Sequence, residues 1–484
     1  MEISTVITRF APSPTGYLHI GGLRTALYSY LFARRNGGKF YLRIEDTDRN
    51  RFVEGAEEKL KDSLLWAGLS WDNEEDIRQS ERLSLYQTYV EQLLLEKKAY
   101  RCFCSPERLE EMRINQQKNK LAPKYDRHCL SLKDEEIHER VERKESFVVR
   151  FRVPDIGRVE FRDEIRKKVS IEANVLDDQV ILKSDGFPTY HLAVVVDDHA
   201  MGVTHVIRGE EWLPSTPKHI LLYRAFGWDI PTFAHLPLLL NSDRSKLSKR
   251  QGDVSVEDYV NKGYLREAIV NYVALLGWNP GKGSTQEFFS LKDLEKEFDL
   301  SKVNKAGAVF DQKRLDWMNA YYIKQFSLEE LREKTKMYWN DFFLRNNLDP
   351  EKFSDEYKKK VLAIEQERMC TLAQVGEKSL FFFQTPQASM ESMIWKDSTV
   401  ESVRSALQKA DQCFESVEDD RWTKEYLQEK LLNICDPEKR GEFFWPLRVA
   451  LTGEKQSPPP NEVAWVIGKE ETRKRLGKAL GLFV

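Results

Sequence analysis

Two short segments hold the residues best suited to binding a nucleotide. The first is the turn PSPTGYLHIGG, which carries His19, Gly21 and Gly22 between a predicted strand and the first predicted helix. Glycines there would let a phosphate or an adenine approach the backbone, and the histidine could donate a hydrogen bond to a phosphate oxygen. Taken alone, the same residues could equally form a tight strand–helix turn with a hydrogen-bonded histidine.

The second segment is KLSKR at residues 246–250, which contains Lys246, Leu247, Ser248 and Lys249. Cations this closely spaced are often only the charged face of a solvated loop. Nucleotidyl transfer, however, depends on positioned positive charge, which these lysines could supply over a triphosphate. Together with the glycine-rich turn, the segment predicts a site for a nucleoside triphosphate.

The two segments resemble, in order and spacing, the two signature motifs of class I aminoacyl-tRNA synthetases. The stretches RIEDTD, PTYHLA, VVDDH and VIRGEEWLPSTPKH are similar to those of bacterial glutamyl-tRNA synthetases, and the similarity extends to RVALTG at residues 448–453. The resemblance implies an enzyme that activates glutamate with ATP and Mg²⁺ and then transfers it to tRNA(Glu). It leaves open whether tRNA(Gln) is also charged.

The resemblance also assigns roles to individual residues. Catalysis would rest on His19, Gly22, Lys246 and Lys249. The residues expected to bind ATP are Ser13, His19, Gly21, Gly22, Lys246, Leu247, Ser248 and Lys249. The residues expected to bind glutamate are Arg9, Ala11, Ser13, Glu45, Tyr190, Arg208 and Trp212.

The charges of the second set suit glutamate. Arg9 and Arg208 stand at the expected carboxyl ends of parallel strands, where a planar guanidinium can hold a carboxylate through two hydrogen bonds. Glu45 would pair with the α-ammonium group, although Arg9 or Glu45 taken singly could form a strand-end ion pair instead. Val194 takes the place of an asparagine usual in the family, which puts one polar contact in doubt. The main alternative to a glutamyl enzyme is a glutaminyl-tRNA synthetase. Such an enzyme binds a neutral side-chain amide and would not need two arginines to hold it.

Three of the six cysteines, Cys102, Cys104 and Cys129, are clustered in the sequence. They could supply three thiolates of a tetrahedral metal site that lacks one ligand. The resemblance implies Zn²⁺, with Tyr125 or water as the fourth ligand, because Ser131 replaces the histidine of the family. Reduced thiols without metal are the alternative, and they too would suit a reducing cytoplasm.

Strands and helices alternate around the glycine-rich turn. We expect strands at residues 5–12 and 39–46, and helices at 23–36 and 54–69. This order favours a parallel sheet with crossover helices. VVV at 194–196 and THVIRG at 204–209 are predicted as further strands, and the chain beyond Asp311 as almost wholly helical. The predicted fold is therefore α/β, a Rossmann-like parallel-sheet catalytic domain with a mixed α/β insertion, followed by an all-α C-terminal half.

A chain of 484 residues is too long for one core. The resemblance implies two halves of the catalytic domain at 1–85 and 197–245, separated by an acceptor-end-binding insertion at 86–196. A stem-contact domain with the KLSKR loop would follow at 246–325, and helical anticodon-binding domains at 326–484.

The composition is compatible with a tRNA-binding enzyme. A net charge of -3 permits local basic patches for tRNA. No apolar run approaches the ~20 residues that a membrane span needs, and the first residues do not resemble a signal peptide. We expect a cytoplasmic monomer without membrane association.

Overall fold

The computed structural model describes residues 5–48, 51, 53–155, 157–247, 255–281 and 283–483. The chain divides into two compact units. The first comprises Met1–Val260 and Arg266–Gln312, and the second comprises Asn261–Leu265 and Lys313–Val484. Each unit is described by itself below.

Two sheets meet at the centre of the first unit. Parallel strands in the order β1-β2-β3 form one sheet, with bounds β1 Ile7–Phe10, β2 Lys39–Ile44 and β3 Ile77–Arg78. The other sheet has the order β7-β6-β10-β9, with bounds β6 Arg158–Asp163, β7 Lys167–Glu172, β9 His205–Gly209 and β10 Thr232–Leu236. Strand β10 runs parallel to β9 and β6, whereas β7 is antiparallel to β6. The amide of Thr204 donates to the carbonyl of Ile7 at 2.9 Å, so β9 lies beside β1.

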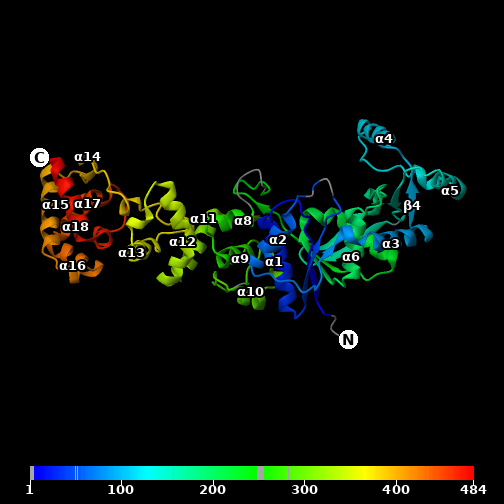
Figure 1. The fold of residues 1–484 in the computed structure, drawn as a ribbon. Coiled ribbons are helices and arrows are strands. Elements are labelled where there is room, and N and C mark those ends of the chain that lie inside the picture. The colour runs from blue at the N-terminus through cyan, green and yellow to red at the C-terminus, as the bar shows by residue number, and fades with distance from the viewer. Residues whose placement is uncertain are drawn as a thin grey trace. The chain divides into compact units, whose positions relative to one another are not determined.

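Helix α1 (Ile20–Arg35) covers β1 and β2 (Figure 1). Its leucines and alanines at three- and four-residue spacing, including Leu23, Leu27 and Leu31, are fully buried. The helix ends before Gly37, whose φ of 62° is the left-handed conformation that favours glycine at a helix end. The predicted second helix is α2 (Ala56–Trp66). The strand–helix–strand–helix order predicted for this region is thus confirmed.

One predicted strand is wrong. Residues 194–196 lie inside helix α6 (Tyr190–Ala200) rather than in a strand. Val194, Val195 and Val196 are all buried, so the helix presents apolar residues on every side and shows no helical periodicity. A short apolar run of this kind cannot be assigned to a strand or a helix by periodicity alone, and its β-branched residues favoured the wrong choice. Helix α6 packs against α3 (Leu83–Leu95) and α7 (Thr216–Phe226).

A third, antiparallel sheet is formed by strands that flank β6 and β7 in the sequence. Its order is β4-β5-β8, with bounds β4 Ala99–Cys102, β5 Val148–Phe151 and β8 Val180–Leu182. Helices α4 (Pro106–Lys118) and α5 (Asp134–Glu142) belong to the same region (Figure 1). The remaining elements of the first unit are β11 Leu239–Leu240, α8 Val256–Asn261, α9 Arg266–Ala274, α10 Leu291–Glu297 and β12 Ala308–Val309.

The second unit is built from helices, and its described residues include no strand. Their bounds are α11 Gln312–Lys324, α12 Leu328–Arg345, α13 Asp355–Glu365, α14 Met390–Met393, α15 Val400–Glu415, α16 Lys424–Ile434, α17 Arg440–Thr452 and α18 Pro460–Leu480. Helices α15, α16 and α17 pack against α18, which bends at Gly468. The predicted fold class, an α/β catalytic part followed by an all-α half, is confirmed. No helix among the described residues combines the length and apolar character needed to cross a membrane.

Candidate active site

A cavity of about 720 Å³ opens at the carboxyl ends of β1, β2 and β9. Open α/β sheets bind ligands at this edge, because the loops after parallel strands converge there. Every residue predicted to bind glutamate lines this cavity, namely Arg9, Ala11, Ser13, Glu45, Tyr190, Arg208 and Trp212. Val194 instead packs in the hydrophobic core and does not line it.

The charged groups on the β1 and β2 side of the cavity are already paired. Arg9 Nε donates to Asp198 Oδ1 at 3.0 Å, and Arg43 Nη1 donates to the same oxygen at 2.7 Å. Arg43 Nη2 also donates to Glu45 Oε1 at 2.9 Å. Burial opposes ionisation of Asp198, but the two guanidinium groups lower its pKa below the usual value. Burial raises the pKa of Glu45, and Arg43 partly offsets this effect.

Arg208 differs from Arg9, because its donors meet only neutral groups. Its Nη2 donates to Thr216 Oγ1 at 2.9 Å, and its Nη1 donates to the Tyr190 hydroxyl at 3.2 Å. Two histidine nitrogens lie at 3.1 and 3.3 Å from its guanidinium. The side chain is 5% exposed, and no carboxylate among the described residues forms an ion pair with it. Burial lowers the pKa of Arg208 below its usual value. Asp198 is near enough to act on Arg208 electrostatically but forms no ion pair with it. A buried cation that forms no ion pair strongly attracts an anionic ligand group.

A second cavity of about 380 Å³ adjoins the first and shares five lining residues with it, namely Gly21, Gly22, Thr25, Gly209 and Glu211. His19, Lys246 and Leu247 also line this smaller cavity. The structure therefore brings the predicted glycine-rich turn and the start of the KLSKR segment to one place. Ser248 and Lys249 lie outside the described residues.

The hydrogen bonds of His19 fix which of its nitrogens can donate. His19 caps α1, and its Nδ1 accepts from the amide of Gly21 at 2.9 Å. In the neutral ring the proton must therefore sit on Nε2, which makes Nε2 a donor. The bridge between His19 and Ser255, and the hydrogen bond from the Val256 amide to Leu18, bring the chain after the KLSKR segment back to this turn.

Several cavity residues were missed by sequence reasoning. Glu211 and Gly209 line both cavities, and Thr15, Asp48 and Lys183 line the larger one. Gly209 and Glu211 lie within three residues after Arg208 in the stretch VIRGEEW. Their closeness to a predicted glutamate-binding residue was the sequence signal that could have identified them. A Cβ at Gly209 would lie 2.2 Å from Glu211 Oε2, which shows how closely this backbone approaches the carboxylate.

The predicted cysteine cluster is assembled beside β4. The Sγ atoms of Cys102, Cys104 and Cys129 all lie within 4.8 Å of one another. Tyr125 Oη lies 3.3 Å from both Cys102 Sγ and Cys104 Sγ, whereas His128 is exposed. The Cys104 and Cys129 sulfurs are 3.5 Å apart, close to the ~3.8 Å that tetrahedral bonds of about 2.3 Å to one zinc ion would give. The hydrogen bond between Cys129 and Cys102 lowers the pKa of Cys102 and raises the pKa of Cys129, so it favours one thiolate within this pair.

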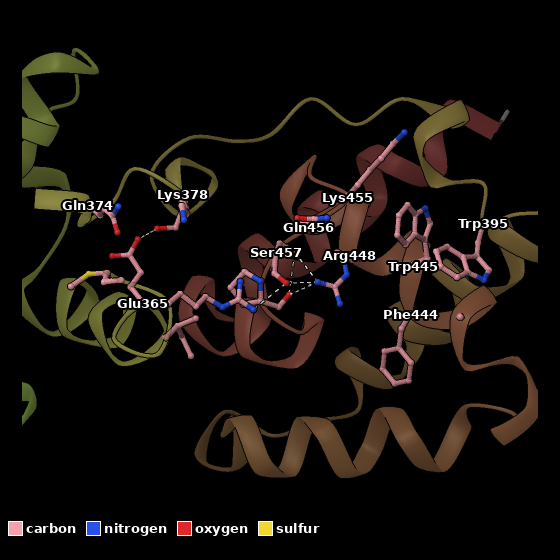
Figure 2. Close-up of a pocket in the computed structure, with 16 residues that line it drawn as sticks. Glu365, Gln374, Lys378, Trp395, Phe444, Trp445, Arg448, Lys455, Gln456 and Ser457 are labelled. Carbon is pink, nitrogen blue, oxygen red and sulfur yellow. Dashed lines mark hydrogen bonds between the residues drawn. The ribbon is translucent and has the colours of Figure 1, made fainter. Parts of the chain in front are cut away.

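The second unit contains a cavity of its own, of about 720 Å³ (Figure 2). Its lining combines cationic and aromatic side chains, namely Arg368, Lys378, Trp395, Phe444, Trp445, Arg448 and Lys455. At one end Glu365 accepts hydrogen bonds from Ser379 and from the amide of Gly376. Arg448 and Arg368 both donate to the carbonyl of Ser457. Cations beside aromatic faces suit a phosphate and a nucleic-acid base.

Comparisons with known proteins agree with this geometry. Residues 5–317 match the family model described as tRNA synthetases class I (E and Q), catalytic domain, and residues 330–480 match an anticodon binding domain. The chain is 46% identical to a glutamate–tRNA ligase of Chloroherpeton thalassium, with 99% of this chain and 98% of the relative covered. It is 44% identical to a glutamate–tRNA ligase of Alkaliphilus metalliredigens, with 98% of each covered.

A solved structure is similar over the same length. The glutamate tRNA ligase from Elizabethkingia meningosepticum, determined in complex with its amino acid, has a TM-score of 0.87 and 37% identity. The match covers 99% of this chain and 100% of that chain. The cavity geometry, the two family models and the full-length relatives agree, and the chain therefore belongs to the bacterial glutamate–tRNA ligase family of class I aminoacyl-tRNA synthetases.

Proposed function

We propose that this ligase binds glutamate in the larger cavity, with Arg208 holding the side-chain carboxylate. The observation that carries the proposal is the contrast between the two arginines: Arg9 is paired with Asp198, whereas Arg208 meets only neutral acceptors. Glutamate would supply the missing anion. Tyr190 and Arg9 would complete the side-chain site, and Glu45 would accept the α-ammonium group.

ATP would occupy the adjoining smaller cavity, with its α-phosphate near the shared Gly21 and Gly22. The α-carboxylate of glutamate attacks the α-phosphorus in line, so that an O–P bond forms and pyrophosphate leaves. His19 Nε2–H and the ammonium of Lys246 stabilise the charge that develops on the phosphates, and we assign the same role to Lys249. Ser13 would contact both substrates, and Leu247 and Ser248 would line the ATP site.

Mg²⁺ would be held mainly by the ATP phosphates. Glu211 is the single carboxylate among the described residues that line the nucleotide cavity, and carboxylate oxygen is a ligand that Mg²⁺ prefers. When bound, the ion neutralises phosphate charge. Glu211 is therefore the residue of this chain that we assign to the metal.

In the second step a ribose hydroxyl of the 3′-terminal adenosine attacks the glutamyl carbonyl, and AMP leaves. We propose tRNA(Glu) as the acceptor, and we assign the 86–196 insertion to its acceptor end and residues 246–325 to its stem. Residues 1–85 and 197–245 would form the catalytic halves, and 326–484 would bind the anticodon. The cationic and aromatic cavity of the second unit would accept an unstacked anticodon base.

We propose one Zn²⁺ bound by Cys102, Cys104 and Cys129, with Tyr125 Oη as the fourth ligand. The donor atoms are the right types at suitable distances. When bound, the ion would hold β4 and the chain around Cys129 together. We also propose that the protein is a cytoplasmic monomer.

Aminoacylation of separate tRNA(Glu) and tRNA(Gln) transcripts tests the proposed function. The purified protein, supplied with ATP and Mg²⁺, should attach glutamate to tRNA(Glu). Glutamylation of tRNA(Gln) in the parallel reaction would widen the tRNA specificity without changing the amino-acid site. Attachment of glutamine in preference to glutamate would contradict the proposal.

A further inference from the structure

Arg208 is held by two histidines that the reaction itself does not use. Arg208 Nε lies 3.1 Å from His235 Nε2, and Arg208 Nη1 lies 3.3 Å from His219 Nδ1. Every guanidinium N–H is a donor, so both histidine nitrogens must act as acceptors. His235 and His219 are therefore both neutral where they contact the cation. Burial lowers the pKa of each below its usual value, and the neighbouring Arg208 adds to the effect. At His235 the hydrogen bond to Asp163 partly offsets this lowering.

The proton of His235 is placed by a carboxylate on the far side of the ring. His235 Nδ1 lies 2.6 Å from Asp163 Oδ2, and both side chains are completely buried. The other oxygen, Oδ1, accepts the amides of Ile165 and Arg166 at 2.9 and 2.7 Å. Burial alone would raise the pKa of Asp163, but the hydrogen bonds from His235 and from these amides lower it. An ionised Asp163 accepts only, which requires the proton on Nδ1 and leaves Nε2 with its lone pair.

Asp163 contacts His235 and not Arg208, so it does not neutralise the cation that faces the cavity. A carboxylate in direct contact with Arg208 would neutralise the guanidinium and compete with a substrate anion, as Asp198 does at Arg9. Asp163 instead acts through the imidazole. It fixes the direction of Arg208 Nε–H while leaving the charge of Arg208 without an anionic partner.

We propose that Asp163 and His235 are positioning residues that hold Arg208 toward the substrate's side-chain carboxylate: Asp163 keeps the proton of His235 on Nδ1, so that Nε2 accepts from Arg208 Nε. The inference rests on the proposed role of Arg208. Asp163 is the last residue of β6 and pairs with Phe233 of β10, so the region that separates the two catalytic halves in sequence supplies this residue. Thr216 Oγ1, at 3.0 Å from His235 Nε2 and 2.9 Å from Arg208 Nη2, completes the contact.

Asp163→Asn is the decisive substitution, because it alters the tautomer with little change in volume. The asparagine oxygen should still accept from the Ile165 and Arg166 amides, which turns its NH2 group toward His235 Nδ1. The NH2 group then also replaces the oxygen that accepts the His235 amide at 3.2 Å. Nδ1 must then accept, the ring proton moves to Nε2, and Nε2–H faces Arg208 Nε–H, donor against donor. We expect the KM for glutamate in tRNA(Glu) aminoacylation to rise at least about tenfold, with the KM for ATP changed less than about twofold.

Asp72→Asn is the matched control, because Asp72 also accepts a strand amide, from Phe40 at 2.7 Å, and pairs with the cation of Arg34 outside the cavity. It should leave both KM values unchanged. Histidine-selective ¹⁵N NMR reports the tautomer directly, with the His235 signal assigned from its absence in His235→Gln. Nδ1–H in the wild type and Nε2–H in Asp163→Asn are expected. Nε2–H or a doubly protonated ring in the wild type would overturn the inference.

A second pair of variants tests the same contact without relying on Asp163→Asn folding. His235→Gln and His235→Leu both remove the Asp163 interaction, but only glutamine keeps an oxygen that can accept from Arg208 Nε. His235→Leu should raise the KM for glutamate several-fold more than His235→Gln does. Equal KM values in the two variants would overturn the inference. If Arg208→Gln raises the KM and neither His235 variant does, the positioning role fails alone; if Arg208→Gln has no effect, the proposed site fails as well.

Discussion

Replacing Arg208 with glutamine should weaken the use of glutamate sharply and bring glutamate and glutamine closer together as substrates. In the wild type, Arg208 is 5% exposed and has only neutral partners among the described residues. Glutamate would pair this charge, whereas glutamine would leave it buried and uncompensated. Leaving a buried charge unpaired costs roughly 3–5 kcal/mol. At ~1.4 kcal/mol per factor of ten, this predicts a preference for glutamate of several hundredfold or more.

In Arg208→Gln the source of that preference is removed. The kcat/KM for glutamate should fall on the order of 10²-fold, since charge-assisted hydrogen bonds contribute about 1.5–3 kcal/mol each. The ratio of glutamate to glutamine kcat/KM should narrow by at least about tenfold. Aminoacylation of tRNA(Glu), followed with each labelled amino acid in turn, measures both quantities. The KM for ATP should change little, because Arg208 does not line the nucleotide cavity.

Two further arginine variants test whether the change in the glutamate-to-glutamine ratio of kcat/KM is specific to Arg208. Arg9→Gln should narrow the same ratio less than Arg208→Gln does, because Arg9 is already paired with Asp198. Arg34→Gln removes a cation that pairs with Asp72 outside the cavity, and it should leave the ratio unchanged. A ratio that stays at the wild-type value in both Arg208→Gln and Arg9→Gln would show that neither arginine reads the side chain.

Four other changes test separate parts of the structure. Lys246→Ala should lower kcat by on the order of 10²–10³-fold with little change in the KM for glutamate. An unchanged kcat would show that Lys246 of the KLSKR segment does not act in catalysis. Cys102→Ser should lose the single zinc ion measured by metal analysis and lower the Tm; equal metal content in both proteins would contradict the site. Arg448→Ala, in the second unit's cavity, should raise the KM for tRNA(Glu) but not for ATP, whereas equal shifts in both would argue against a base-binding role. Burial raises the pKa of Glu365 to about 7 from a usual value of 4.5, so the free energy of unfolding should fall by up to roughly 3 kcal/mol as pH rises from about 4.5 to about 7. Glu365→Gln should flatten that dependence, and an unchanged slope in urea titrations would exclude Glu365 as its origin.

The residues at the ends of strands were predictable from the sequence. Arg9 and Arg208 are the next-to-last residues of β1 and β9, and Glu45 directly follows β2. Parallel strands must bring their carboxyl ends to one edge. The family resemblance predicted four further glutamate-binding residues, Ala11, Ser13, Tyr190 and Trp212, and all four line the same cavity. The clustering of Cys102, Cys104 and Cys129 was likewise visible in their spacing.

The partners of these residues were not predictable, because they depend on tertiary packing. Asp198 reaches Arg9 from the last turn of α6, a helix in which the sequence predicted a strand at residues 194–196. Asp163 reaches His235 only because β6 pairs with β10, a register between segments far apart in the chain. Local propensity and spacing carry no information on such pairings. The difference in ion pairing between Arg9 and Arg208 emerges only from the assembled structure.

A crystal structure of the protein with bound glutamate tests the central claim most directly. The account predicts that the side-chain carboxylate lies within hydrogen-bonding distance of the Arg208 guanidinium and the Tyr190 hydroxyl. The α-ammonium group should lie beside Glu45, with the α-carboxylate directed toward the cavity that His19 and Lys246 line. Glutamate bound with its α-carboxylate on Arg208, or bound outside this cavity, would contradict the account.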